Sequence, residues 1–154
     1  MKYMKIRAKG SFFIIILFAL SFFTSFTILE GNAVENISVS AKSFENTIII
    51  EFKNEGQNTA KIKTINIWLA SGDSFESFKT ESGWSGQTYG NGQGLTFSTS
   101  GVLNPGESVK FGTITNKKID AINWKVVDEN ENEIGPQKTK IVEISQTQII
   151  IEKE

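Results

Sequence analysis

From residue 36 onward, apolar residues alternate with polar ones over most of the chain. A period of two residues places successive side chains on opposite faces of a β-strand, whereas an amphipathic helix repeats every 3.6 residues or so. In one of these runs Ile65, Ile67 and Leu69 share a face, and Trp68 is expected to point outward from the other. No helical stretch longer than one turn is predicted, so this part of the chain folds as strands.

Turn signals divide the alternating runs. Pro105 and Gly106 are placed as the central residues of a type II turn. The segment 128–133 is polar and reads as a hairpin loop, and 82–94 contains five glycines and is predicted to be a loop. Seven to nine short strands with no helix between them predict an all-β fold, a single antiparallel β-sandwich.

The absence of cysteine and histidine limits the chemistry of the chain. A domain of this size must be stabilised by packing, because it can form no disulfide. The usual ligands of zinc, copper and haem are missing, as is the histidine base of a catalytic triad. We therefore expect no cofactor, no metal site and no enzymatic activity.

The charge distribution argues against a nucleic-acid partner. From Val34 to the C-terminus the chain has twelve lysines and no arginine against sixteen acidic residues, which gives a net charge of −4. Binding to phosphates requires a basic face. The partners that remain are a surface protein, a glycan or further copies of the same chain.

The N-terminus has the pattern of an export signal. Four cations precede the apolar run 11–29, and small residues lead up to Ala33. This arrangement predicts a secretory signal cleaved after Ala33. The predicted organisation is a hydrophobic signal or anchor helix over 1–33, the sandwich over 34–136 and a C-terminal strand or tail over 137–154.

Two alternatives to a cleaved signal remain open. The apolar run is long enough to cross a hydrocarbon layer of about 30 Å, so it could be retained as a membrane anchor. The residues from Arg7 to Gly10, followed at once by the apolar run, also resemble prepilin-type leaders. That resemblance implies cleavage after Gly10 and a hydrophobic helix that packs into a filament.

The three tryptophans are expected to have different roles. Trp124 lies on an alternating apolar face and is expected in the core. Trp84 and Tyr89 lie in the glycine-rich segment, where their rings could contact a ligand. Alternatively, Trp84 folds back and caps one end of the sandwich. Trp68 is the third candidate for an exposed ring.

The residues Phe52 to Gly56 and Leu103 to Gly112 resemble the strand and turn pattern of immunoglobulin-like modules on archaeal and bacterial surface proteins. The resemblance implies an immunoglobulin-like sandwich. The same segments are also similar to family 2 carbohydrate-binding modules. On that resemblance Trp68 and Trp84 would lie where sugar-stacking aromatics are found.

Two further motifs are weighed against simpler interpretations. The segment 128–133 has oxygen ligands at alternate positions, as calcium loops do, but lacks the glycine and the final glutamate of such a loop, so a solvated hairpin tip is favoured. Asn36 begins an Asn-Ile-Ser sequon, which an exported chain could have glycosylated.

These observations predict a secreted or cell-surface protein, with membrane anchoring as one form of that location. Its expected role is structural or adhesive, and one form of that role is a filament subunit. In that form 34–41 or the tail 140–154 would complete the sheet of a neighbouring copy. The alternative function is a carbohydrate-binding module that uses Trp68, Trp84 and Tyr89.

The leader interpretation predicts the N-terminus of the mature protein. Cleavage of a secretory signal leaves Val34, whereas prepilin-type processing leaves Ser11 and a retained anchor leaves Met1. We expect Val34 when the exported protein is analysed by intact-mass spectrometry and N-terminal sequencing. A chain that still begins at Met1 would contradict cleavage and favour the anchor.

Overall fold

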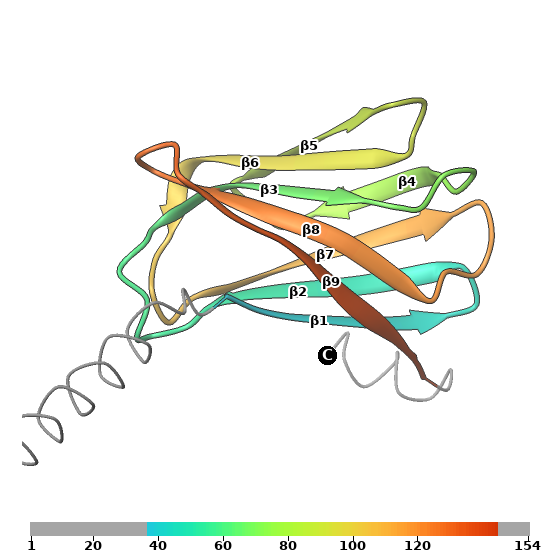
Figure 1. Cartoon of the computed structure of the whole chain (residues 1–154), viewed down its shortest axis with the longest axis horizontal. Coiled ribbons are helices and arrows are strands. Elements are labelled where there is room, and N and C mark those ends of the chain that lie inside the picture. Colours follow the sequence, from blue (N-terminus) through green and yellow to red (C-terminus); the bar gives the residue numbers. More distant parts are fainter. Residues whose placement is uncertain (1–36, 145–154) are drawn as a thin grey trace, which may run out of the picture. The chain divides into compact units, whose positions relative to one another are not determined.

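A computed structural model of the 154-residue chain describes residues 37–144 (Figure 1). The leader with its two cleavage sites, the Asn36 sequon and the apolar block 149–151 lie outside the described residues, so these predictions are not tested. Within 37–144 the structure has no helix that could cross a membrane.

Residues 37–144 form nine β-strands and confirm the predicted all-β fold. In chain order they are β1 Ile37–Phe44, β2 Thr47–Asn54, β3 Ile62–Trp68, β4 Phe75–Thr80, β5 Trp84–Tyr89, β6 Gly94–Leu103, β7 Ser108–Thr115, β8 Ala121–Asp128 and β9 Glu133–Glu143.

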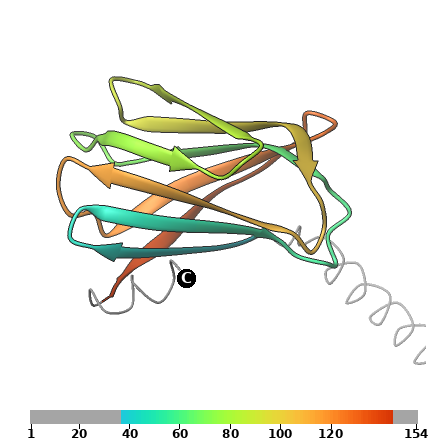
Figure 2. The ribbon, with the colours of Figure 1, turned by 180° about the vertical axis from the view of Figure 1, so that it is seen from behind.

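The strands form two packed layers, which both ribbon views show (Figures 1 and 2). One layer has the order β4-β7-β2-β1 and the other the order β8-β3-β6-β5. The layers are joined by β9, which pairs with β8 along its first part and with β1 near its end. This strand runs across the domain boundary predicted at residue 136.

The contact between β9 and β1 departs from a purely antiparallel sandwich. Ala41 pairs with Ile141 and Ser43 pairs with Glu143 in parallel register. The opposite edge of β1 pairs with β2 over all eight residues of each strand. Residues 37–44 therefore contribute to the sheet of their own chain, through β2 along the whole strand and through β9 at residues 41–43.

The inward faces of the two layers form the core, as the alternation predicted. Buried apolar residues come from every strand except β5. Phe97 of β6 stacks on Phe111 of β7 with ring centroids 3.9 Å apart, and Phe52 of β2 meets Trp124 of β8 edge-on at 5.6 Å. These aromatic pairs connect one layer with the other. The predicted core position of Trp124 is confirmed.

The prediction of a loop over 82–94 is wrong for its first half, which forms β5. This strand pairs with β6 from Trp84↔Thr99 to Tyr89↔Gly94. The inward face of β5 has Gly86 at a position where a large apolar residue would be expected. Only glycine fits there, because the ring of Phe78 occupies the space that a β-carbon would fill. The strand therefore lacks an apolar alternation that could have identified it.

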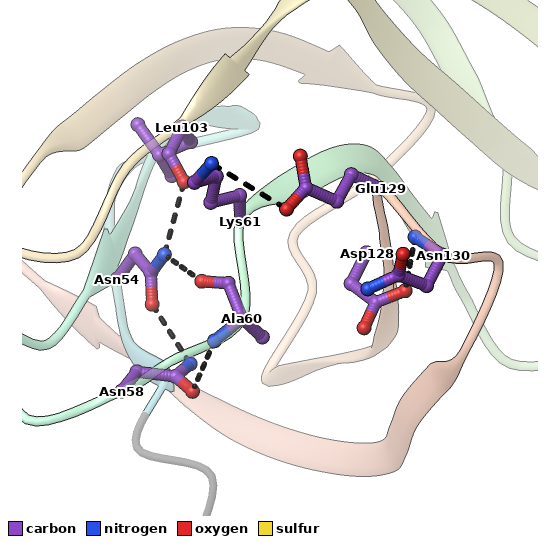
Figure 3. Close-up of polar contacts among 8 residues, drawn as sticks. All are labelled: Asn54, Asn58, Ala60, Lys61, Leu103, Asp128, Glu129 and Asn130. Atoms are coloured by element: carbon purple, nitrogen blue, oxygen red, sulfur yellow. Dashed lines mark hydrogen bonds and ion pairs between the residues drawn. The ribbon is translucent and has the colours of Figure 1, made fainter.

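A buried amide holds one end of the sandwich together (Figure 3). Asn54 is fully buried at the end of β2. Its Nδ2 donates to the carbonyl oxygen of Ala60 at 2.8 Å and to that of Leu103 at 2.9 Å, and its Oδ1 accepts from Asn58 Nδ2 at 2.8 Å. One side chain thus ties β2 to the β2–β3 loop and to the end of β6.

This arrangement predicts that Asn54→Ala destabilises the protein by about 3 kcal/mol, because two carbonyl groups and the Asn58 amide lose their partner away from water. Urea unfolding followed by tryptophan fluorescence measures the change. The matched control is Asn130→Ala, at an exposed hairpin position, which should stay within about 0.5 kcal/mol of the parent. Equal effects of the two substitutions would contradict the structural role of Asn54.

Candidate functional site

The outer surface of the β8-β3-β6-β5 layer gathers two of the three aromatic residues singled out by the sequence. We call this surface the aromatic face. It is formed by the outward residues of four strands, which are Trp68, Asn66, Tyr89, Gln87, Gly94, Thr96, Asn123 and Lys125.

The strand register places Trp68 and Tyr89 in one row across the sheet. Trp68 of β3 pairs with Gly94 of β6, and Gly94 pairs with Tyr89 of β5. On the other side of Trp68, the row continues to Asn123 of β8. Residues that are direct partners in a sheet point to the same face. The prediction that Trp68 points outward is therefore confirmed.

The ring of Tyr89 lies over Gly94. A β-carbon built on Gly94 would overlap the ring, and Gly94 is buried even though its missing side chain would point outward. Tyr89 is nevertheless 44% exposed. Partial burial raises the pKa of the phenol above its ordinary value of 10.0, an effect that nearby Lys125 partly opposes. The phenol is thus neutral at physiological pH.

Polar groups surround the two rings. Next to the aromatic row lies a second row, in which Asn66 pairs with Thr96 and Thr96 with Gln87. Asn66 Oδ1 accepts a hydrogen bond from Thr96 Oγ1 at 2.8 Å, which fixes the orientation of that amide. Lys125 Nζ lies 2.6 Å from Glu133 Oε1, so this part of the face is close to neutral.

Trp84 does not belong to this face. It lies on β5 at the opposite parity from Tyr89, is partly buried against the core, and meets Phe111 edge-on with ring centroids 5.6 Å apart. The alternative in which Trp84 caps one end of the sandwich agrees with this position. The structure thus brings together Trp68 and Tyr89, but not all three candidates.

The calcium-like segment 128–133 uses its first carboxylate internally. Asp128 Oδ1 accepts the backbone N–H groups of Asn130 and Asn132, each at 2.8 Å, and Oδ2 accepts from Asn132 Nδ2 at 3.0 Å. The hydrogen bond from the Asn132 side chain is the main cause that lowers the pKa of Asp128. Within 37–144 no group of three acidic side chains is placed to hold a metal ion.

Sequence reasoning missed the polar half of the aromatic face. Gln87 and Gly94 fell in the segment predicted as a loop, and Thr96 had no distinguishing pattern. Only the placement of Asn66 beside Trp68 on one face of a strand was visible from the alternation. The pairing of β5 with β6 was needed to bring the remaining residues to the same surface.

No protein-family model and no curated protein sequence matches the chain. Among solved structures, it is similar to an uncharacterised protein from Nocardia farcinica described as having an immunoglobulin-like fold, at 9% identity and a TM-score of 0.47 over 69% of this chain and 97% of that one.

Two further solved structures are similar. A non-cellulosomal cohesin from the archaeon Archaeoglobus fulgidus shares 14% identity with a TM-score of 0.44, covering 76% of this chain and 97% of that one. The chitin-binding domain of a Pyrococcus furiosus chitinase shares 23% identity with a TM-score of 0.38, covering 64% and 90%. At these levels the similarities assign neither a family nor an activity.

The position of Tyr89 over Gly94 predicts a specific titration change. In Gly94→Ala the added methyl group displaces the ring toward water, so the pKa of Tyr89 should fall toward 10. A spectrophotometric titration in a Tyr3→Phe background isolates Tyr89, the other of the two tyrosines. Gly101→Ala, also on β6 but with no close contact to its β-carbon, should leave the titration unchanged. An unchanged titration in Gly94→Ala would contradict the described ring position.

Proposed function

We propose that the protein is an exported, non-catalytic binding module of the cell surface, and that the aromatic face binds a glycan. The observation that carries this proposal is the row formed by Trp68, Gly94 and Tyr89 on an outward sheet face. Two aromatic residues flank a glycine there, and the tyrosine remains 44% exposed instead of joining the core.

The chemistry of the face suits a neutral sugar. Sugar rings present an apolar C–H surface that can pack on an aromatic ring, and their hydroxyl groups require donors and acceptors at the edges. Asn66, Gln87 and Asn123 each have an amide, which supplies both kinds of group. A charged ligand is a poorer match, because Lys125 is already paired with Glu133.

The row of aromatic residues favours an extended chain over a single sugar. The backbones of Trp68 and Tyr89 lie on strands about 10 Å apart, and the Tyr89 ring leans over Gly94 on the strand between them, so the two rings are closer together than the strands. An extended polysaccharide can pack along this row and continue beyond it at both ends.

The predicted export agrees with the same function. The leader expected over 1–33 would carry the domain out of the cytoplasm. A module displayed there meets polysaccharides of its own envelope or of neighbouring surfaces. Adhesion requires only binding, which agrees with the lack of histidine and cysteine for the common catalytic sites.

The test is sedimentation of the full-length chain, kept in mild detergent, with insoluble cellulose and chitin. We expect retention on at least one of them, weakened about fivefold or more by Trp68→Ala and by Tyr89→Ala, because each loses an aromatic stacking contact worth about 1 kcal/mol. Tyr89→Phe keeps the ring and should retain most of the affinity.

Lys79→Ala is the control on the other layer. Lys79 is exposed on β4, away from the aromatic face, so its removal should leave retention unchanged. Thermal unfolding of each variant shows that the fold persists. If the parent is retained on neither polysaccharide, or if a Trp68→Ala/Tyr89→Ala double variant is retained as well as the parent, glycan binding by this face is refuted.

A further inference from the structure

The two edge strands of the sandwich differ in charge. The strand order leaves β4 at one end and β5 at the other. β4 carries Glu76 and Lys79, whereas β5 has no charged residue, and the whole stretch 82–106 around it has none. Proteins commonly place charges or proline on edge strands, because an unguarded edge pairs with another chain. β5 has neither safeguard.

The free backbone groups of β5 can be identified from its neighbours. Trp84 N–H donates to the Glu81 carbonyl at 3.2 Å, and the Trp84 carbonyl accepts from Thr80 Oγ1 at 3.1 Å. Trp84 thus directs both groups away from β6. In an antiparallel strand the direction alternates, so Gly86 and Thr88 also direct theirs away from β6. Within 37–144 no strand other than β6 pairs with β5. The N–H and carbonyl groups of Gly86 and Thr88, four groups in all, therefore have no ladder partner there.

We propose that β5 pairs with β5 of a second copy of this chain, antiparallel and about a two-fold axis at Gln87. In this register Gly86 of each copy faces Thr88 of the other, and the two residues exchange both of their hydrogen bonds. All four free groups of each edge are then satisfied. The interface is isologous and closed, so it yields a dimer.

The side chains allow this register. On the outer surface Ser85 faces Tyr89 of the other copy, so a small residue lies next to a large one. The two Gln87 side chains face each other and can exchange amide hydrogen bonds. No like charges meet, because β5 is uncharged.

The pairing would join two aromatic faces into one surface. Across the two-fold axis the row of Asn66, Thr96 and Gln87 becomes continuous with the same row of the other copy, and the Trp68–Tyr89 rows of the two copies lie on either side of it. This consequence rests on the proposed glycan binding, since two linked sites raise the avidity for a repeating polymer. The pairing itself stands on the edge alone and is tested without a glycan.

Disulfide trapping tests the pairing in the full-length chain, which has no cysteine of its own. Gln87→Cys places two thiols at a non-hydrogen-bonded pair, with α-carbons about 4.5 Å apart, within the range that a disulfide spans. Mild oxidation in detergent should convert most of this variant to a covalent dimer, seen by non-reducing electrophoresis.

The control is Thr96→Cys. Thr96 is the direct partner of Gln87 on the same face, but it lies one strand further in. Two copies of it would be three strand spacings apart, about 14 Å, which is too far for a disulfide. We expect dimer formation at least tenfold slower than in Gln87→Cys. Equal rates in the two variants, or no dimer in either, would overturn the proposal.

A second variant separates edge pairing from other modes of association. Thr88→Pro removes an N–H group that the ladder with β6 does not use, so the fold should survive, whereas pairing across the edge should not. In the Gln87→Cys background, Thr88→Pro should reduce the covalent dimer to the amount formed by Thr96→Cys. The midpoint of thermal unfolding should not change. Undiminished cross-linking in a folded protein would refute the assigned edge.

Discussion

Packing between the inward faces of two β-layers is the interaction on which this domain depends. The chain has no cysteine, so no disulfide restricts the unfolded state. Its stability must come from apolar burial and from aromatic contacts across the layers, in particular Phe97 on Phe111 and Phe52 against Trp124. β9 closes one side of this arrangement, because it pairs with both layers.

The aromatic face is separate from the residues that stabilise the core. The core already contains its large residues, and removing Trp68 or Tyr89 from the outer surface would leave the interlayer contacts intact. Tyr89 is stabilised locally by its position over Gly94, which lets an aromatic ring remain half exposed on a folded sheet. An ordered and partly exposed ring is well suited to binding, since little of its conformational freedom remains to be lost.

The two edge strands, β4 and β5, differ in their charge and in what they contribute to the core. β4 has the charges expected of a protected edge, and its Phe78 packs over Gly86 and against Phe97, which covers the core at the open side. β5 itself contributes only the partly buried Trp84 to the core. The proposed pairing with a second copy would account for the uncharged composition of β5.

The sequence by itself determined the fold class, the inward positions such as Ile65 and Trp124, and the outward direction of Trp68. Each of these follows from the two-residue period, which is a local property of a strand. Only the tertiary structure decided that β5 is a strand, that Tyr89 covers Gly94, and that Trp84 faces inward while Trp68 does not. Those features depend on which strands become neighbours and in which register, and that choice is made by packing between residues far apart in the chain.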